Sequence, residues 1–96
     1  MAKQIQNDKK FLVISCTTSE LMKIEPAALG ICDRCNNAAL HGYLCCALGH
    51  YFYCEDCYND WVKRATRYSE DIEYEQKVFN QYKTAFEKAG IWEEQQ

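Results

Sequence analysis

Two C-x-x-C pairs constrain this chain more than any other feature of its sequence. The pairs are Cys32 with Cys35 and Cys54 with Cys57, and eighteen residues separate them. Two such pairs at this spacing are typical of a structural zinc site, in which four thiolates surround one ion as a tetrahedron. The sequence therefore predicts that Cys32, Cys35, Cys54 and Cys57 bind one metal ion, with zinc as the cofactor.

The length and the cysteine content limit the class of protein. A chain of 96 residues makes one domain, here a zinc-binding domain over residues 1–96, and metal commonly supplements a core of this size. The start is polar, and no apolar run approaches the ~20 residues that span a bilayer, so we expect neither a secretory signal nor a membrane partner. The count of seven cysteines is odd, and paired C-x-x-C motifs indicate metal in a reducing compartment. The predicted localisation is cytoplasmic.

The first third of the chain predicts a strand and a short helix. Residues 11–16 are apolar and β-branched, which favours a strand. Thr17, Thr18 or Ser19 can then cap a short helix over residues 20–24, and Pro26 prevents that helix from continuing.

The middle third predicts a hairpin followed by a helix. Residues 43–48 and 51–53 have the composition of two strands, and Gly49 with His50 suggests a tight turn between them. After Cys54 the pattern becomes helical, because Cys57, Trp61 and Ala65 recur every four residues and share one face.

The last third predicts a long amphipathic helix over about residues 70–89, with Ser69 as its cap. Its apolar stripe consists of Ile72, Phe79, Tyr82, Phe86 and Ala89. Its acidic residues, Glu70, Asp71, Glu73 and Glu75, are predicted to form a solvated face.

A C-x-x-C knuckle, a hairpin and a helix whose first turn supplies two ligands define a treble-clef zinc finger. The stretch from Ile31 to Trp61 reads ICDRCNNAALHGYLCCALGHYFYCEDCYNDW, and it resembles treble-clef fingers of the GATA and LIM types. GATA-type fingers have a gap one residue shorter, and LIM modules usually include a histidine ligand and a second site. The chain also looks like small uncharacterised bacterial proteins with the same order of motifs, which implies no activity. The expected fold is α+β, with an N-terminal strand, a treble-clef module over residues 31–67 and the C-terminal helix over residues 69–90.

Other residues compete for the metal. Cys45 and Cys46 lie on a strand, where neighbouring side chains face opposite sides, so both cannot easily reach one ion. We expect one of them to pack inward and the other to be a partly exposed thiol. Whether Cys45, Cys46 or His50 joins a metal site stays open at this point. His41 and His50 are interpreted as turn and surface residues. Iron accepts the same four thiolates, so zinc and iron remain alternatives.

The predicted function is a zinc-stabilised module that binds another protein, because ten aromatic rings between residues 43 and 82 can supply an interaction patch. A homodimer is a further possibility. The GATA resemblance implies nucleic-acid binding instead, through Lys63, Arg64 and Arg67. Against this, residues 70–96 carry three lysines and seven acidic residues, a net of −4, and an acidic tail disfavours phosphate contacts. We find no catalytic constellation, and an iron-binding electron carrier is the remaining alternative.

Overall fold

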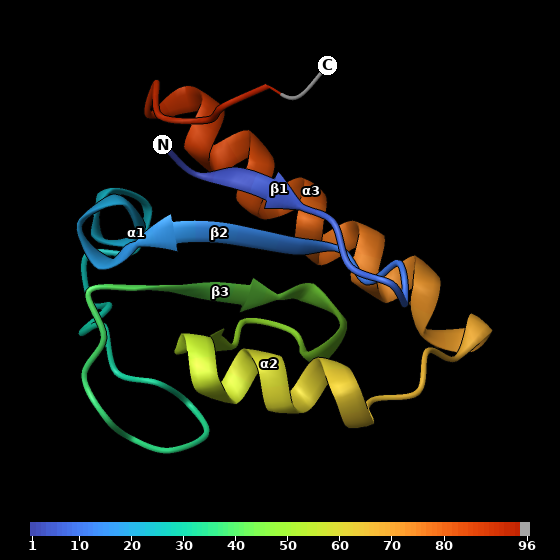
Figure 1. The fold of residues 1–96 in the computed structure, drawn as a ribbon. Coiled ribbons are helices and arrows are strands. Elements are labelled where there is room, and N and C mark those ends of the chain that lie inside the picture. The colour runs from blue at the N-terminus through green and yellow to red at the C-terminus, as the bar shows by residue number, and fades with distance from the viewer. Residues whose placement is uncertain (95–96) are drawn as a thin grey trace.

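A four-stranded antiparallel sheet lies at the centre of the molecule (Figure 1). The computed structural model describes residues 1–94. The strands, which lie side by side in chain order, are β1 (Lys3–Ile5), β2 (Val13–Thr17), β3 (His41–Cys45) and β4 (Phe52–Tyr53). The helices are α1 (Thr18–Ile24), α2 (Glu55–Arg64) and α3 (Ile72–Lys88). The fold is therefore α+β, as the sequence predicts. Within the described residues, no helix is both long and apolar enough to span a membrane.

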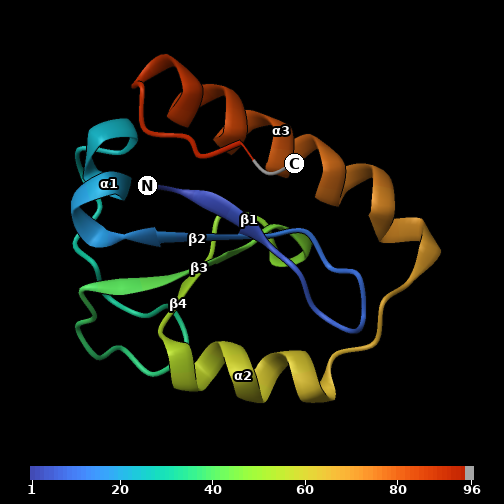
Figure 2. The same cartoon turned by 45° about the horizontal axis from the view of Figure 1, so that its top comes forward.

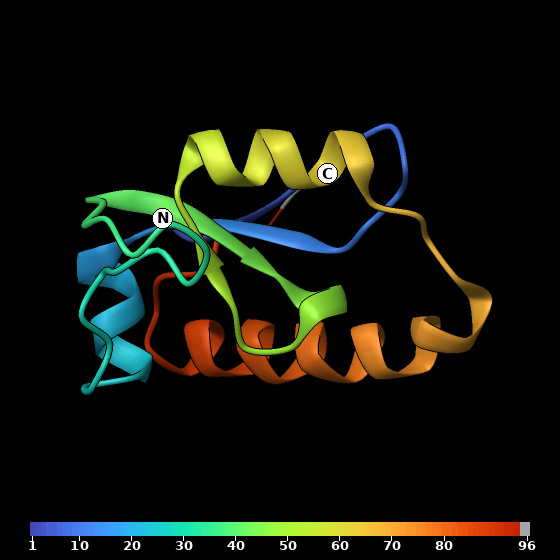
Figure 3. The ribbon, with the colours of Figure 1, turned by 90° about the horizontal axis from the view of Figure 1, so that it is seen from below.

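Helices α2 and α3 cover opposite faces of the sheet, which Figure 3 shows between them. Helix α1 lies at one end of the sheet, directly after β2 (Figure 2). Two apolar clusters result, one on each face. The α3 core contains Ile14, Cys16, Leu21, Leu44, Cys46, Phe52, Val78, Phe79, Tyr82 and Phe86, together with Ala2. The α2 core contains Phe11, Val13, Cys32, Cys45, Tyr53 and Tyr58.

Neighbouring residues of the sheet contribute to different cores, because successive side chains of a strand point to opposite faces. On β3, Leu44 lies in the α3 core and Cys45 in the α2 core, and Cys46, the first residue after the strand, lies in the α3 core. Cys45 and Cys46 are both fully buried, so the prediction that one of them is partly exposed is wrong. The reason is that α3 covers the face of the sheet that α2 leaves open.

The first predicted strand is confirmed with a later start. Strand β2 begins at Val13 instead of residue 11, because the two preceding residues make other hydrogen bonds. The Phe11 N–H donates to Asn7 Oδ1 at 3.0 Å, and the Leu12 N–H donates to Glu75 Oε2 at 3.0 Å. Strand β1, which has no strand pattern in the sequence, pairs with β2 through Lys3 opposite Ser15.

The predicted helix after this strand is confirmed as α1, and Thr17 is its N-cap. The Glu20 N–H donates to Thr17 Oγ1 at 3.1 Å, and the Thr17 N–H donates to Glu20 Oε1 at 2.8 Å. These reciprocal bonds form a capping box, which satisfies two backbone donors that a helix start otherwise leaves free.

The predicted hairpin is present, but its connection is longer than a tight turn. Strands β3 and β4 pair through Tyr43 opposite Tyr53 and Leu44 opposite Phe52. Strand β3 ends at Cys45, and the next residues form a 3-10 turn, η1 (Cys46–Leu48). The chain leaves the sheet there because Cys46 turns into the α3 core, so Gly49 and His50 belong to a wider loop.

The C-terminal helix is confirmed with shorter bounds, Ile72 to Lys88. Ser69 is not its cap: it begins a separate 3-10 turn, η2 (Ser69–Asp71), and Asp71 at the helix start makes no side-chain capping bond. Phe79, Tyr82 and Phe86 of the predicted stripe are buried. Ala89 is exposed, and Ile72 keeps 41% of its surface exposed, because the first turn of α3 extends beyond the sheet (Figure 3).

One predicted surface acid is buried. Glu70, Asp71 and Glu73 are exposed, as expected, but only 1% of the surface of Glu75 is exposed to solvent. One oxygen of Glu75 accepts the hydrogen bond from the Leu12 N–H, and the other lies 2.9 Å from Nη2 of Arg67. A buried carboxylate is tolerated when it is paired and hydrogen-bonded in this way. Glu75 therefore joins α3 to the start of β2 and to the segment after α2.

Candidate metal centre

The first cysteine pair sits on a tight turn of the backbone. The Cys32 N–H donates to the Asn37 carbonyl at 2.9 Å, and the Asn36 N–H donates to the Cys32 carbonyl at 2.9 Å. Asn36 adopts a positive φ of 63°, a conformation that asparagine tolerates better than most residues. The turn brings the thiols of Cys32 and Cys35 to the same side, where both can face one ion.

Two side chains inside this turn fasten it to the rest of the fold. Asp33 binds the outer edge of β4: its N–H donates to the Phe52 carbonyl at 2.8 Å, and its Oδ2 accepts from the Phe52 N–H at 2.7 Å. Arg34 reaches α2, where its guanidinium pairs with the Asp60 carboxylate and donates to the Cys57 carbonyl at 3.4 Å. The first pair is therefore held against the two elements that carry the second pair.

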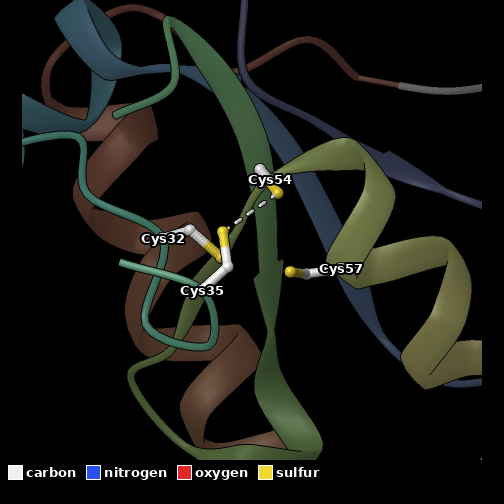
Figure 4. Close-up of side chains that lie close together, drawn as sticks. All are labelled: Cys32, Cys35, Cys54 and Cys57. Carbon is white, nitrogen blue, oxygen red and sulfur yellow. Dashed lines mark hydrogen bonds between the residues drawn. The ribbon is translucent and has the colours of Figure 1, made fainter. Parts of the chain in front are cut away.

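The second pair is placed by the junction of β4 and α2. Cys54 directly follows the strand and is the N-cap of α2, and Cys57 lies in the first turn of that helix. The Tyr58 N–H donates to the Cys54 carbonyl at 2.9 Å, which fixes the first helical turn. Figure 4 shows the side chains of all four cysteines converging from the knuckle and the helix start.

The four sulfur atoms form a compact group. All lie within 4.8 Å of one another, and the Sγ atoms of Cys35 and Cys54 are 3.8 Å apart. A tetrahedral ion with metal–sulfur bonds of about 2.3 Å requires sulfur–sulfur edges of about 3.8 Å. The donor set therefore fits a tetrahedral metal such as zinc with little rearrangement. Four thiolates would fill the coordination sphere, which is the composition of a structural site and leaves no position for a reacting water.

The surroundings of Cys32 favour its thiolate. Burial opposes ionisation, but backbone N–H groups of Cys35, Cys54 and Arg34 direct hydrogen bonds to its sulfur and lower the pKa of Cys32 to about 6. The Arg34 N–H lies 3.4 Å from that sulfur. Desolvation and the neighbouring thiols instead raise the pKa of Cys57 to about 12, since negative charge on one sulfur disfavours a second. A bound cation would relieve this repulsion, which agrees with a metal-binding role.

The other candidate ligands lie outside this group. Cys45 and Cys46 are buried in the two apolar cores, and burial raises the pKa of both thiols, that of Cys46 to about 12. His50 is exposed, with its Nδ1 3.1 Å from the Tyr82 hydroxyl. His41 is also exposed, with its Nε2 2.7 Å from Ser15 Oγ. Among the described residues, the candidate metal group contains the two C-x-x-C pairs alone.

The three basic residues of the nucleic-acid alternative are not all free to bind phosphate. Arg64 pairs with Asp60 at 3.1 Å, and Arg67 pairs with the buried Glu75. Lys63 lies in the last turn of α2, where its carbonyl accepts a hydrogen bond from Nζ of Lys9 at 2.8 Å. Arg67 therefore has a structural partner, Glu75, which its position in the sequence does not reveal.

Sequence reasoning identifies the sulfurs but misses the residues that position them. Asp33 and Arg34 are the variable positions of the first C-x-x-C, and nothing in a single sequence shows that they bind β4 and α2. Lys9 is missed for the same reason: its Nζ binds the carbonyls of Lys63 and Ala65 across more than fifty residues of chain, at the C-terminal end of α2. Each of these contacts is set by tertiary structure.

No protein-family model, curated protein sequence or solved structure matches this chain.

Proposed function

We propose that the protein is a treble-clef zinc module that binds another protein. The four-sulfur group supports the zinc site, since thiolates in a tetrahedron suit zinc and close the coordination sphere. The order of knuckle, hairpin and helix around this group supports the treble-clef assignment. A closed site stabilises a fold and performs no hydrolysis, so in this proposal the protein is not an enzyme.

Exposed apolar side chains beside the knuckle carry the protein-binding part of the proposal. Leu29 keeps 80% of its surface exposed and Leu40 keeps 88%, and both line one shallow hollow of about 170 Å³. The two leucines flank the segment that contains the first cysteine pair, and the Ala39 N–H joins its two ends by donating to the Gly30 carbonyl at 2.8 Å. Exposed leucines grouped on one surface are typical of interaction sites. A metal that orders this segment would order the surface as well.

The metal is tested on protein purified under reducing conditions. Elemental analysis should give one zinc per chain, and Cys32→Ser should lose it. Iron bound by four thiolates would give a coloured protein, and an absorption spectrum separates the two metals. Protein without bound metal would contradict the proposed site.

The interaction surface is tested by adding charge to it. The variant Leu29→Asp with Leu40→Asp should lose association with the partner captured by the wild-type chain from the native host. Ile72→Asp, which places one aspartate on an exposed residue of α3, should keep it. Repeating the comparison with the purified partner excludes indirect capture, and light scattering shows whether the partner is a second copy. Equal association of both variants would contradict the proposed surface.

Nucleic-acid binding is the competing outcome. The net charge is −3, and two of the three candidate cations on and after α2, Arg64 and Arg67, already pair with acidic residues. We expect only weak binding of DNA and RNA, with a log–log salt slope near about −3 or shallower. Tight, specific binding in physiological salt would replace the protein-interaction proposal.

A further inference from the structure

A second, larger hollow shares Leu29 and Gly30 with the hollow that Leu29 and Leu40 line. It has a volume of about 290 Å³ and is bounded by the end of α1, the segment leading to the knuckle, strands β3 and β4, and α3. Its apolar part consists of Leu21, Leu44 and Phe52, all buried, with Ala28 and Leu29 at its side. Its polar part consists of Glu25, Asp33, His50 and Tyr82.

The polar part is organised around the Tyr82 hydroxyl. This oxygen lies 3.1 Å from Nδ1 of His50. Burial first, and then the nearby Glu25 carboxylate, raise the pKa of Tyr82, so its hydroxyl remains a proton donor. Tyr82 is itself buried in the α3 core, so its hydroxyl is a fixed point of the lining that contacts His50.

The charge of the hollow is negative. Glu25 and Asp33 both line it, and no lysine or arginine does so among the described residues. Neither carboxylate forms an ion pair within residues 1–94. One oxygen of Asp33 accepts from the Phe52 N–H, and its other oxygen has no hydrogen-bond partner among residues 1–94. Two carboxylates in a lining that also contains buried apolar side chains, with no lysine or arginine beside them among the described residues, complement a cation that carries an alkyl chain.

We propose that this hollow receives a lysine or arginine side chain of the partner protein. The inference rests on the proposed function and names the chemistry of that partner. The methylene stem lies on Leu44 and Phe52, and the cationic head meets the carboxylates of Glu25 and Asp33. Leu29 lines both this hollow and the one that it forms with Leu40. The fitting partner segment therefore presents a basic residue beside an apolar one.

The test uses small probes in place of the unidentified partner. N-acetyl-arginine methylamide is titrated into the metal-loaded protein while backbone amide signals are followed by NMR. The matched control is N-acetyl-citrulline methylamide, which has the same shape without the charge. The arginine probe should cause saturable shifts confined to the segments that line the hollow, which are residues 21–33, 44, 50–52 and 82. It should bind at least about tenfold more tightly than the citrulline probe. Equal affinities, no saturable shift, or shifts elsewhere on the surface would overturn the inference.

Variants locate the charge that the probe meets. Glu25→Gln combined with Asp33→Asn should weaken the arginine probe at least about tenfold, because both substitutions keep the shape and remove the charge. Glu70→Gln, which removes an exposed acid far from the hollow in the sequence, should not change the affinity. If the double variant fails to fold, Glu25→Gln alone is compared with Glu70→Gln, and an unchanged affinity would again overturn the inference.

The failure of this inference differs from failure of the proposed function. If the arginine probe does not bind but the charged Leu29 and Leu40 variant loses its partner, the protein-binding proposal stands and the basic-residue inference is wrong. If the probe binds at the hollow but that variant keeps its partner, the hollow is a cation site outside the interface and the inference is likewise wrong.

Discussion

Cys45 and Cys46 show how little separates two chemical environments in this protein. They are identical neighbours, yet one faces the core that contains Cys32 and the other faces the core beneath α3. Strand geometry predicts the opposite directions from the sequence. It does not predict that both are buried, since this depends on a helix that lies about thirty residues further along the chain.

We predict that Cys45→Ser and Cys46→Ser each retain one zinc per chain. Each substitution should lower the free energy of unfolding by about 1–3 kcal/mol, because it places a hydroxyl in an apolar site. Elemental analysis and denaturant unfolding measure the two effects. Cys54→Ser is the matched comparison and should lose the metal. Release of zinc by either Cys45→Ser or Cys46→Ser would show that the ligand set is wrong.

The helices differ in how strongly local sequence determines them. Helix α1 carries its own start signal, the capping box of Thr17 and Glu20, and α2 carries acids in its first turn and Lys63 and Arg64 in its last. Both are predictable for this reason. The start of α3 has no side-chain cap, so its position is set by packing instead, and the sequence reading places it too early.

The cap of α1 should make stability depend on pH. Burial of Glu20 opposes its ionisation, but hydrogen bonds from Thr17 and the charge of the N-terminus lower its pKa below the usual 4.5. A lowered carboxyl pKa gives stability that is complete above the unfolded pKa and is lost as the pH falls through the folded one. Glu20→Gln should cost about 0.5–1 kcal/mol at pH 7, and this difference should shrink below pH 4.5.

Urea unfolding of the wild-type protein and of Glu20→Gln, from pH 7 to below pH 4.5, measures the difference in their free energies of unfolding. Contributions to stability that the wild-type protein and the variant share, such as protonation of the thiolates, cancel in the comparison. A difference that stays constant down to strongly acidic pH would show that the Glu20 charge does not stabilise α1.

The apolar face of α3 should contribute unequally along its length. Phe79 is buried in the α3 core, so Phe79→Ala should lower the free energy of unfolding by about 3–5 kcal/mol. Ile72 belongs to the same stripe in the sequence but is exposed, and Ile72→Ala should change stability by no more than about 0.5 kcal/mol. Thermal or denaturant unfolding measures both. Similar costs for the two variants would mean that the stripe packs as the sequence pattern suggests, against the structure.

The whole molecule consists of one sheet between two cores, with the candidate metal centre on one side alone. The four sulfur positions and the order of knuckle, hairpin and helix can be predicted from spacing. The layered arrangement cannot, because β1 has no apolar alternation and is recognised only by its pairing with β2. Glu75 is mispredicted for the same physical reason: its partners at Leu12 and Arg67 are set by the packing of α3.

Removal of the metal should therefore affect the two sides differently. With a chelator and a reductant present, hydrogen exchange should accelerate first in residues 31–39 and in the first turn of α2. Amides of β2 and α3 should keep more of their protection, because the α3 core contains none of the four ligands. Hydrogen exchange followed by mass spectrometry measures this order. Simultaneous loss of protection in all segments would mean that the metal centre holds the two cores as one cooperative unit.

Other segments of the chain form hydrogen bonds along the open edges of the two outer strands. At β4, both outward backbone groups of Phe52 are bound by Asp33. Beside β1, the Ala2 N–H donates to the Ile91 carbonyl and the Ala2 carbonyl accepts from the Glu93 N–H, so residues 91–93 run parallel to the start of the edge. A strand of another molecule would have to displace these bonds before it could extend the sheet. At high concentration the protein should therefore resist the growth of intermolecular sheets that leads to fibrils, and loosening the knuckle would remove this protection on the β4 side.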